Sequence, residues 1–242
     1  MRAVIILLFL SNVLSMSAQY CCTEAGKVLH YVTTDKKEGK TLKDSIFIKD
    51  VADDEERTVV EQRWYGDSYS IASIMDGTNR EILIYHKKSG VTDYIMLDAE
   101  TENAQARKGF IAHYPPKDSI KAEKEYQGYS KYIRAEGRIC IPIKENAYMD
   151  EELPPCKYFQ KMGPMKINAS LKGKYKGKET IHTPAGDFEC VKIYTESKGS
   201  LMFISQSEYS ITWYALNIGI VKTEKYTKRG KVLESSLLYA IH

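Results

Sequence analysis

The sequence predicts a mainly β protein of antiparallel strands with little helix, and three observations support this prediction. Runs of β-branched, aromatic and other apolar residues recur along the chain and are separated by polar turns. The links between successive runs are short, which favours antiparallel neighbours because parallel strands need long crossover connections. Tyrosine, which favours strands, occurs 18 times among 242 residues.

The N-terminal part predicts a meander of strands. Asp76-Gly77 is a strong hairpin signal, because glycine tolerates the positive φ that tight hairpin turns need. The strands predicted in this part cover residues 28–33, 42–51, 57–65, 69–75, 81–86 and 91–97.

The middle of the chain is less regular. Asp98 stands as an N-cap before helix-favouring residues, so we expect a short helix over 98–107, which Pro115-Pro116 ends. Residues 121–132 are polar and ambiguous. A strand is expected over 137–143, followed by a loop over 144–155.

The C-terminal part again predicts strands, separated by turns at Lys176-Gly177, Pro184 to Gly186, Lys198-Gly199 and Lys228 to Lys231. The strands predicted in this part cover residues 166–175, 178–183, 188–196, 201–205, 209–216, 219–227 and 232–241.

The first residues have the order of a secretory signal peptide. A positive charge opens the chain, residues 3–10 form an unbroken apolar run, and small residues follow up to Ala18. We expect cleavage after Ala18; Ser17 is the alternative because Met16 is larger than the residue usual at its position. The apolar run is shorter than the roughly 20 residues of a spanning helix, which argues against a transmembrane anchor.

The mature chain, residues 19–242, is expected to form a single β-rich domain that is soluble after cleavage. No Gly/Ser linker, repeat or low-complexity tract divides it. A lipoprotein is a weaker interpretation, because Gln19 and Tyr20 rather than small residues precede Cys21. The formal net charge of +3 gives no reason to expect nucleic acid as a partner.

The chain contains five cysteines, and export permits disulfides. Cys140 and Cys156 flank a proline-bearing loop and are the pair that a disulfide would join. The odd number leaves at least one free thiol. No Cys-x-x-Cys occurs, so neither a zinc ribbon nor a thioredoxin-type motif is indicated.

Three stretches show a recognisable pattern: Glu179 to Ile193 with its Thr-Pro-Ala-Gly turn, Trp213 to Lys222 with an aromatic pair before Gly-Ile-Val-Lys, and Gly26 to Tyr31. They resemble a family of uncharacterised exported proteins of Gram-negative gut bacteria. The resemblance implies a YmcC-like fold, in which a large curved antiparallel sheet forms an open or half-closed barrel with little helix. It also implies the periplasm or outer envelope as the location, and it carries over no catalytic or binding residue.

Catalytic motifs are absent from the sequence. The histidines lack zincin spacing, and neither a Gly-x-Ser-x-Gly elbow nor a Gly-x-Gly-x-x-Gly loop occurs. His182 and Cys190 lie across a predicted turn, so a nucleophilic pair is one reading. A small buried cysteine beside a histidine whose hydrogen bonds are made within the fold is the commoner arrangement. Together with the missing motifs, this leads us to expect no enzyme, no cofactor and no metal.

Lys172, Lys174, Lys176 and Lys178 have strand spacing, which predicts that all four ammonium groups point to one side. A solvated face that blocks edge pairing is the simpler interpretation. The alternative is a stripe that attracts lipid headgroups, glycolipid or acidic polysaccharide.

Aromatic residues on predicted strands are a second candidate binding feature, because a concave sheet lined by rings holds an acyl chain or stacks on a sugar. Trp213 and Tyr214 are the pair with the clearest pattern. An ordinary β core uses the same residues. The full set is Tyr65, Tyr69, Tyr85, Tyr94, Tyr209, Trp213, Tyr214 and Tyr226.

These observations predict an exported, non-enzymatic binding or carrier protein for a lipid-like or amphipathic ligand. The alternative is an assembly factor for surface polysaccharide or envelope complexes, which would act through a flat exposed apolar patch. The sequence does not indicate an oligomeric state.

Overall fold

A computed structural model describes residues 19–68, 79–201 and 204–242, so the predicted signal peptide over 1–18 and the predicted strand over 69–75 lie outside the described residues. The described part contains two α-helices with a short 3-10 helix between them: α2 (Ala99–Ile111), η1 (Pro116–Asp118) and α3 (Ser119–Tyr129). Its strands are β1 (Val28–Asp35), β2 (Lys40–Asp53), β3 (Arg57–Gly66), β4 (Arg80–His86), β5 (Val91–Asp98), β6 (Ile133–Ile143), β7 (Cys156–Met162), β8 (Met165–Thr183), β9 (Gly186–Leu201), β10 (Ile204–Ala215), β11 (Gly219–Tyr226) and β12 (Val232–Ile241).

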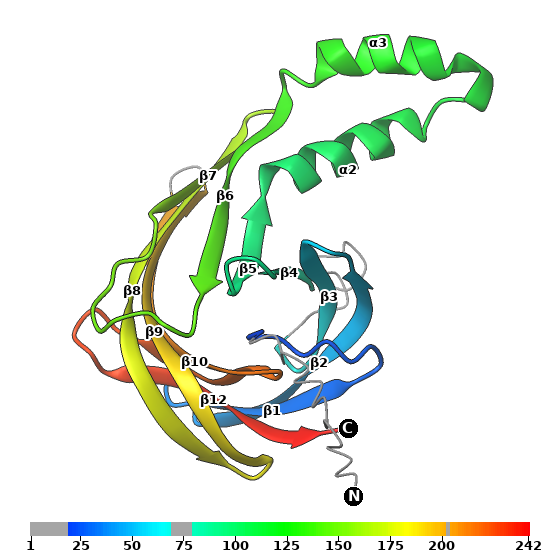
Figure 1. Ribbon diagram of the computed structural model, residues 1–242. Helices are drawn as coiled ribbons and strands as arrows, with labels where there is room; N and C mark the ends of the chain where they lie inside the picture. The colour runs from blue at the N-terminus through cyan, green and yellow to red at the C-terminus, as the bar shows by residue number, and fades with distance from the viewer. Residues whose placement is uncertain (1–18, 69–78, 202–203) are drawn as a thin grey trace, which may run out of the picture.

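The strands form a closed antiparallel barrel in which each one pairs with its neighbours in the sequence (Figure 1). The first and last strands also pair, from Leu29 opposite Ile241 to Asp35 opposite Glu234. The expectation of an open or half-closed barrel was therefore wrong in its degree of closure. Closure gives β1 and β12 a partner on both sides, which removes the unpaired edges that an open sheet would expose.

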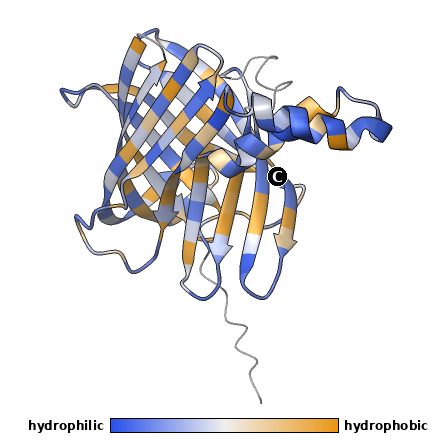
Figure 2. Cartoon of the chain, turned by 90° about the horizontal axis from the view of Figure 1, so that it is seen from above, coloured by the Kyte–Doolittle hydropathy of each residue, from blue (hydrophilic) through white to orange (hydrophobic). Residues whose placement is uncertain are grey.

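Side chains alternate between the two faces of the sheet, as Figure 2 shows by the alternation of hydrophobic and hydrophilic colours along the strands. On β3, Thr58, Val60 and Gln62 are buried while their neighbours are more exposed. The period of two that marked these segments as strands thus also decides which residues face the interior.

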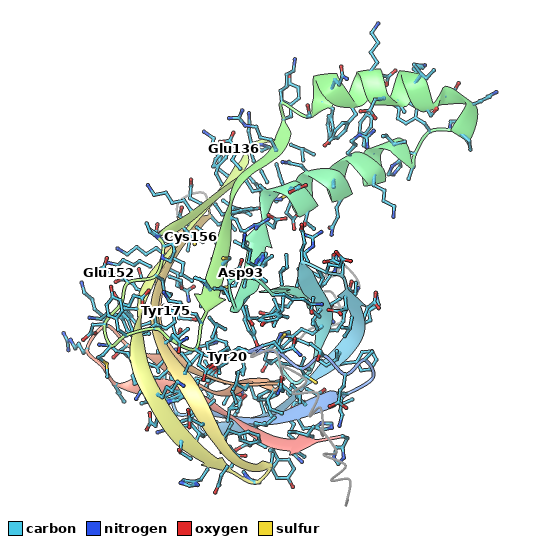
Figure 3. All side chains as sticks on the ribbon, viewed as in Figure 1. Tyr20, Asp93, Glu136, Glu152, Cys156 and Tyr175 are labelled. Carbon is cyan, nitrogen blue, oxygen red and sulfur yellow. The ribbon has the colours of Figure 1, made fainter. Side chains whose placement is uncertain are left out.

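The interior is divided along the barrel axis. Near the end where β1 starts and β12 ends, buried apolar residues such as Leu29, Ile48 and Leu83 fill the barrel. Tyr20, Cys21 and Cys22 precede β1 and belong to the same core. Figure 3 shows Tyr20 inside the ring of strands. The chain therefore plugs this end of its own barrel.

The helices form a hairpin between β5 and β6 that projects from the opposite end of the barrel (Figure 1). The predicted cap is confirmed, since Oδ2 of Asp98 accepts hydrogen bonds from the backbone N–H and the hydroxyl of Thr101, at 3.2 and 2.8 Å. The ambiguous residues 121–132 lie mostly in α3, and Phe110 of α2 packs on its Tyr126 and Tyr129. No helix in the described part of the chain is both long enough and apolar enough to cross a membrane.

Strands β8 and β9 correct two predicted turns, since Lys198-Gly199 lies within β9 and Lys176-Gly177 within β8. Residues 166–175 and 178–183 belong to a single strand, and Lys176-Gly177 forms a β-bulge against β9. Gly177 has a φ of +82°, so the bulge uses the conformational freedom that made this dipeptide look like a turn. Strand β7 was not predicted.

Candidate binding cavity

A cavity of about 510 Å³ occupies the half of the barrel that the apolar core leaves open. It lies on the side from which the helical hairpin projects, and residues from most of the strands line it. Its wall is rich in hydroxyl groups, contributed by residues such as Thr33, Thr195, Ser210, Thr212, Thr223 and Ser236. This polar wall distinguishes it from the mainly apolar pockets that hold most small ligands.

Aromatic rings lie where the cavity meets the apolar core. Trp64, Tyr94 and Tyr214 line the cavity. The rings of Tyr94 and Tyr214 meet edge to face with centroids 4.9 Å apart. The ring centroids of Tyr31 and Trp64 lie 5.7 Å apart. Such packing fixes the rings in place. Tyr94 and Tyr214 are each only 3% exposed, and Trp64 is the half-buried ring among the three that line the cavity.

Glu81, at the start of β4, brings a carboxylate into the same place. Its Oε2 accepts a hydrogen bond of 3.1 Å from Nε1 of Trp64 and another from the Gln62 side chain. Burial raises the pKa of the Glu81 carboxyl, and these two hydrogen bonds offset only part of that effect. Among the described residues, no lysine, arginine or histidine lies within 4 Å of this carboxylate.

The other carboxylates of the lining have partners within the protein. Asp44 accepts hydrogen bonds from the backbone N–H of Ser68 at 2.9 Å and from the Ser68 hydroxyl at 2.7 Å. Glu234 lies 3.2 Å from Lys225, and Glu208 lies 3.9 Å from the same ammonium group. Glu208 and Glu234 therefore have a cationic partner, whereas Asp44 and Glu81 are held by hydrogen bonds alone.

The plug of residues 19–22 closes the inner end of this space. The hydroxyl of Tyr94 donates to the backbone oxygen of Tyr20 at 2.9 Å, and the backbone N–H of Tyr20 donates to Oγ1 of Thr92 at 3.0 Å. The backbone N–H of Asn217 donates to the backbone oxygen of Gln19 at 2.7 Å. The plug is thus tied to β5 and to the β10–β11 turn.

The predicted lysine stripe lies outside the cavity and its charges are matched by acids. Lys172 pairs with Glu196 at 3.1 Å, and Lys174 and Lys176 both reach Asp150. The β-bulge changes the alternation, so Lys178 stands opposite the buried Val191 and does not share the face of the other three. The expectation that all four point to one side was wrong, and an anion-binding role for them stays a prediction.

Trp213 and Tyr214 point to opposite faces of the barrel. Tyr214 lines the cavity. The Trp213 ring lies between the ammonium groups of Lys192 and Lys222, with 5.0 and 4.6 Å to the centroid, and its Nε1 donates to Glu179 at 2.9 Å. Of the proposed binding pair, only Tyr214 belongs to the cavity.

Cys140 and Cys156 are free thiols in the structure. Cys156 stands opposite Leu171, which lines the cavity, whereas Cys140 stands opposite Ile95, the neighbour of the cavity residue Tyr94. Alternation therefore places the two side chains on different faces of the sheet. The Cys156 thiol donates to the Cys140 carbonyl oxygen at 3.3 Å, and a bridge between the two stays a prediction.

His182 and Cys190 have separate partners in the structure. Nδ1 of His182 lies 2.8 Å from Oδ1 of Asp187 on an exposed hairpin. The Cys190 thiol is fully buried and donates to the Phe188 carbonyl oxygen at 3.4 Å, and burial raises its pKa to about 12. A thiol in this state is a poor nucleophile, so this geometry does not favour a nucleophilic pair, and the expectation of no enzyme stays a prediction.

Sequence reasoning named Tyr94 and Tyr214 but missed Trp64, Glu81 and Asp44. Asp44 shares its alternation with Leu42 and Ile46, and this period of two was a usable signal that it faces inward. Glu81 offered no signal, because a carboxylate at the start of a strand ordinarily lies in solvent. Tyr69 lies outside the described residues.

Comparison with known proteins supports the fold. A family model described as DUF3108-like matches residues 121–238. A candidate lipoprotein from Parabacteroides distasonis has a solved structure that matches with a TM-score of 0.59 at 16% identity, covering 93% of this chain and 99% of that chain. A candidate exported protein from Bacteroides fragilis, described as having a YmcC-like fold, matches with a TM-score of 0.56 at 16% identity and the same two coverages, 93% and 99%. No curated protein matches the chain.

The expected resemblance to exported proteins with a YmcC-like fold is confirmed as a likeness of fold. One neighbour is described as a candidate lipoprotein and the other as a candidate exported protein. At this level of identity the likeness concerns architecture and not a ligand or a reaction.

Proposed function

We propose that this chain is an exported, non-enzymatic binding protein that holds a small amphipathic ligand in the cavity of its barrel. The observation that carries the proposal is the cavity itself, a space of about 510 Å³ with a wall of hydroxyls and aromatic rings. This volume lies within the range of ligand sites, roughly 300–1,000 Å³. Export is supported by the signal-peptide pattern and by the descriptions of the two structural neighbours.

The lining decides between kinds of amphipathic ligand. The apolar end of the barrel is filled by the core and by the plug of residues 19–22, so a long acyl chain has no apolar space to enter among the described residues. The open half presents Trp64, Tyr94 and Tyr214 beside Ser, Thr and carboxylate groups. A ligand with one small apolar face and several polar groups fits this wall better than a lipid tail does.

Native mass spectrometry of the mature protein, purified gently from its own envelope fraction, tests the proposal. We expect a bound species in one-to-one ratio that solvent extraction releases. Ser236 lines the cavity and Ser235 is its neighbour on β12, pointing to the opposite face. Ser236→Phe should abolish the bound species and Ser235→Phe should retain it. Loss of the ligand in both variants, or in neither, would contradict binding in the cavity.

A role as an assembly factor is the second candidate, and the helical hairpin favours it. The hairpin extends beyond the barrel (Figure 1), and Ile120 on α3 is 87% exposed. Tyr129 at the end of α3 and Tyr132 just after it are also exposed, at 42% and 51%, and several exposed apolar and aromatic residues on one projecting element suit contact with a partner protein. Proteins that co-purify with the wild type but not with an Ile120→Asp variant, while the cavity is empty in both, would favour this function over ligand binding.

A further inference from the structure

The cavity wall carries an excess of negative charge. Its lining contains four carboxylates, from Asp44, Glu81, Glu208 and Glu234, and the ammonium group of Lys225. Lys225 is shared between Glu208 and Glu234, while Asp44 is held by hydrogen bonds from Ser68. Within the described residues neither Asp44 nor Glu81 has a cationic partner, so these two carboxylates carry unmatched charge.

Glu81 has an oxygen available to a ligand. The hydrogen bonds from Trp64 and Gln62 both end on Oε2, and among the described residues none is donated to Oε1. These two donors hold the carboxylate in one orientation against the cavity. A carboxylate that is held in place and lacks a cation is a strong site for one, because charge-assisted hydrogen bonds are about twice as strong as neutral ones.

Aromatic rings line the same cavity as this carboxylate. Trp64 contacts it directly, and Tyr94 and Tyr214 line the same cavity. Burial, and after it the charge of Glu81, raises the pKa of the Tyr31 and Tyr214 hydroxyls, which places those hydroxyls within range of its field. The faces of Trp and Tyr rings attract cations, and quaternary ammonium groups are recognised by aromatic cages of this composition.

From this arrangement we infer that the ligand carries a positively charged nitrogen, an amine or a quaternary ammonium group, which lies between the Glu81 carboxylate and the rings of Trp64, Tyr94 and Tyr214. The inference rests on the proposed binding function and adds the chemical class of the ligand. An anionic ligand would meet the repulsion of the unmatched carboxylate, and a neutral ligand would leave its charge uncompensated in a partly buried site.

Fluorescence of Trp64 provides the test. The chain has two tryptophans, and Trp213 lies on the outer face of the barrel. The Trp213→Phe variant therefore leaves Trp64 in the cavity as the only indole reporter. We would titrate it with hexyltrimethylammonium, hexylammonium, 1-hexanol and hexanoate, four probes that share one alkyl chain and differ in the charge of the head group.

The two cationic probes should bind at least about tenfold more tightly than hexanol, and hexanoate should bind most weakly. Adding Glu81→Gln should remove this preference and leave the affinity for hexanol within about twofold of its value, because glutamine keeps the shape of the side chain without its charge. Glu136→Gln, on the exposed part of β6, is the matched control and should change no affinity.

The outcomes separate the inference from the proposed function. Binding of hexanol as tightly as the cationic probes, or an unchanged preference in Glu81→Gln, would overturn the cationic ligand and leave the binding function intact. If no probe changes the Trp64 signal at millimolar concentration, both the cavity as a binding site and the cationic ligand are wrong.

Discussion

The hydroxyl of Tyr94, in the fifth strand of the barrel, donates a hydrogen bond of 2.9 Å to the backbone oxygen of Tyr20, which lies 74 residues earlier in the chain. Both side chains are buried, at 3% and 2% exposure. This bond joins the plug to the wall of the barrel. It also fixes the position of a ring that lines the cavity, so the plug and the candidate site depend on each other.

The Tyr94→Phe variant should destabilise the protein by about 1–2 kcal/mol, because it leaves a buried carbonyl oxygen without its donor. Urea unfolding followed by circular dichroism measures this change. Tyr85→Phe is the matched control, since Tyr85 is equally buried and no described residue bonds its hydroxyl. We expect less than about 0.5 kcal/mol there, and equal losses in the two variants would show that the bond to the plug contributes nothing.

Gly219 provides a test of how closely the Tyr94 hydroxyl approaches the start of β11. It begins β11 with a φ of +96°, and a Cβ at this position would lie 2.4 Å from the Tyr94 hydroxyl and 3.6 Å from the Tyr20 oxygen. Gly219→Ala should therefore lower the free energy of unfolding by about 3 kcal/mol or more, the sum of backbone strain and a clash with the wall of the core.

Gly230→Ala separates these two contributions. Gly230 has a φ of +81° but no atom within 4 Å of its Cβ position, so its substitution causes backbone strain alone, about 1 kcal/mol. Thermal unfolding of both variants gives the comparison. A Gly219→Ala protein as stable as Gly230→Ala would mean that the Tyr94 hydroxyl does not approach the β10–β11 turn as closely as described.

The raised pKa of the Glu81 carboxyl leads to a prediction of how stability depends on pH. Burial raises the pKa of its carboxyl in the folded state, so folding favours the protonated form. Such a group stabilises the protein below its unfolded pKa, about 4.3, and this contribution is lost as the pH rises through the folded pKa. Glu81→Gln does not titrate, and it should therefore be more stable than the wild type at pH 7.

The advantage of Glu81→Gln should shrink as the pH falls from 7 to 4. Urea unfolding of both proteins at several pH values measures the difference. Glu136→Gln, on an exposed part of β6, should show no such trend. A stability difference between Glu81→Gln and the wild type that stays constant with pH would mean that the carboxyl is not desolvated as its position implies.

Much of the fold could be predicted from the sequence, because period-two alternation and turn chemistry are local properties. Asp98 as a cap and the last hairpin follow from a few neighbouring residues each. Closure of the barrel could not be predicted from local patterns, since the pairing of Leu29 with Ile241 joins distant parts of the chain. The bulge at Gly177 was mistaken for a turn because both use a glycine with positive φ.

The candidate site was less accessible to sequence reasoning for a related reason. Tyr214 was identified because aromatic residues on strands are conspicuous, yet nothing local separates it from Trp213, which faces outward. Glu81 matters because Trp64 and Gln62 donate to it while no cation does. That relationship depends on the register between β3 and β4, which a single sequence does not specify.

The reactivity of the thiols provides a last prediction, which tests both the burial of the cysteines and the presence of a disulfide. Burial raises the pKa of Cys21, Cys140 and Cys190 to about 12, so at pH 8 only about one molecule in 10⁴ carries the reactive thiolate at each of them. Burial also raises the pKa of Cys22. Cys156 is only half-buried, at the start of β7, and its thiol should react first with iodoacetamide.

Peptide mapping by mass spectrometry after brief alkylation of the native protein should find the label at Cys156, and Cys156→Ser should remove most of it. Alkylation in urea without a reductant then counts all thiols: five labels mean that every cysteine is free, and three mean that one disulfide exists. Because alternation directs Cys140 and Cys156 to different faces, a bridge between them would require a local change in β6 or β7. Native labelling of Cys21 as fast as that of Cys156 would instead contradict the buried plug, since only an opened barrel end exposes that thiol.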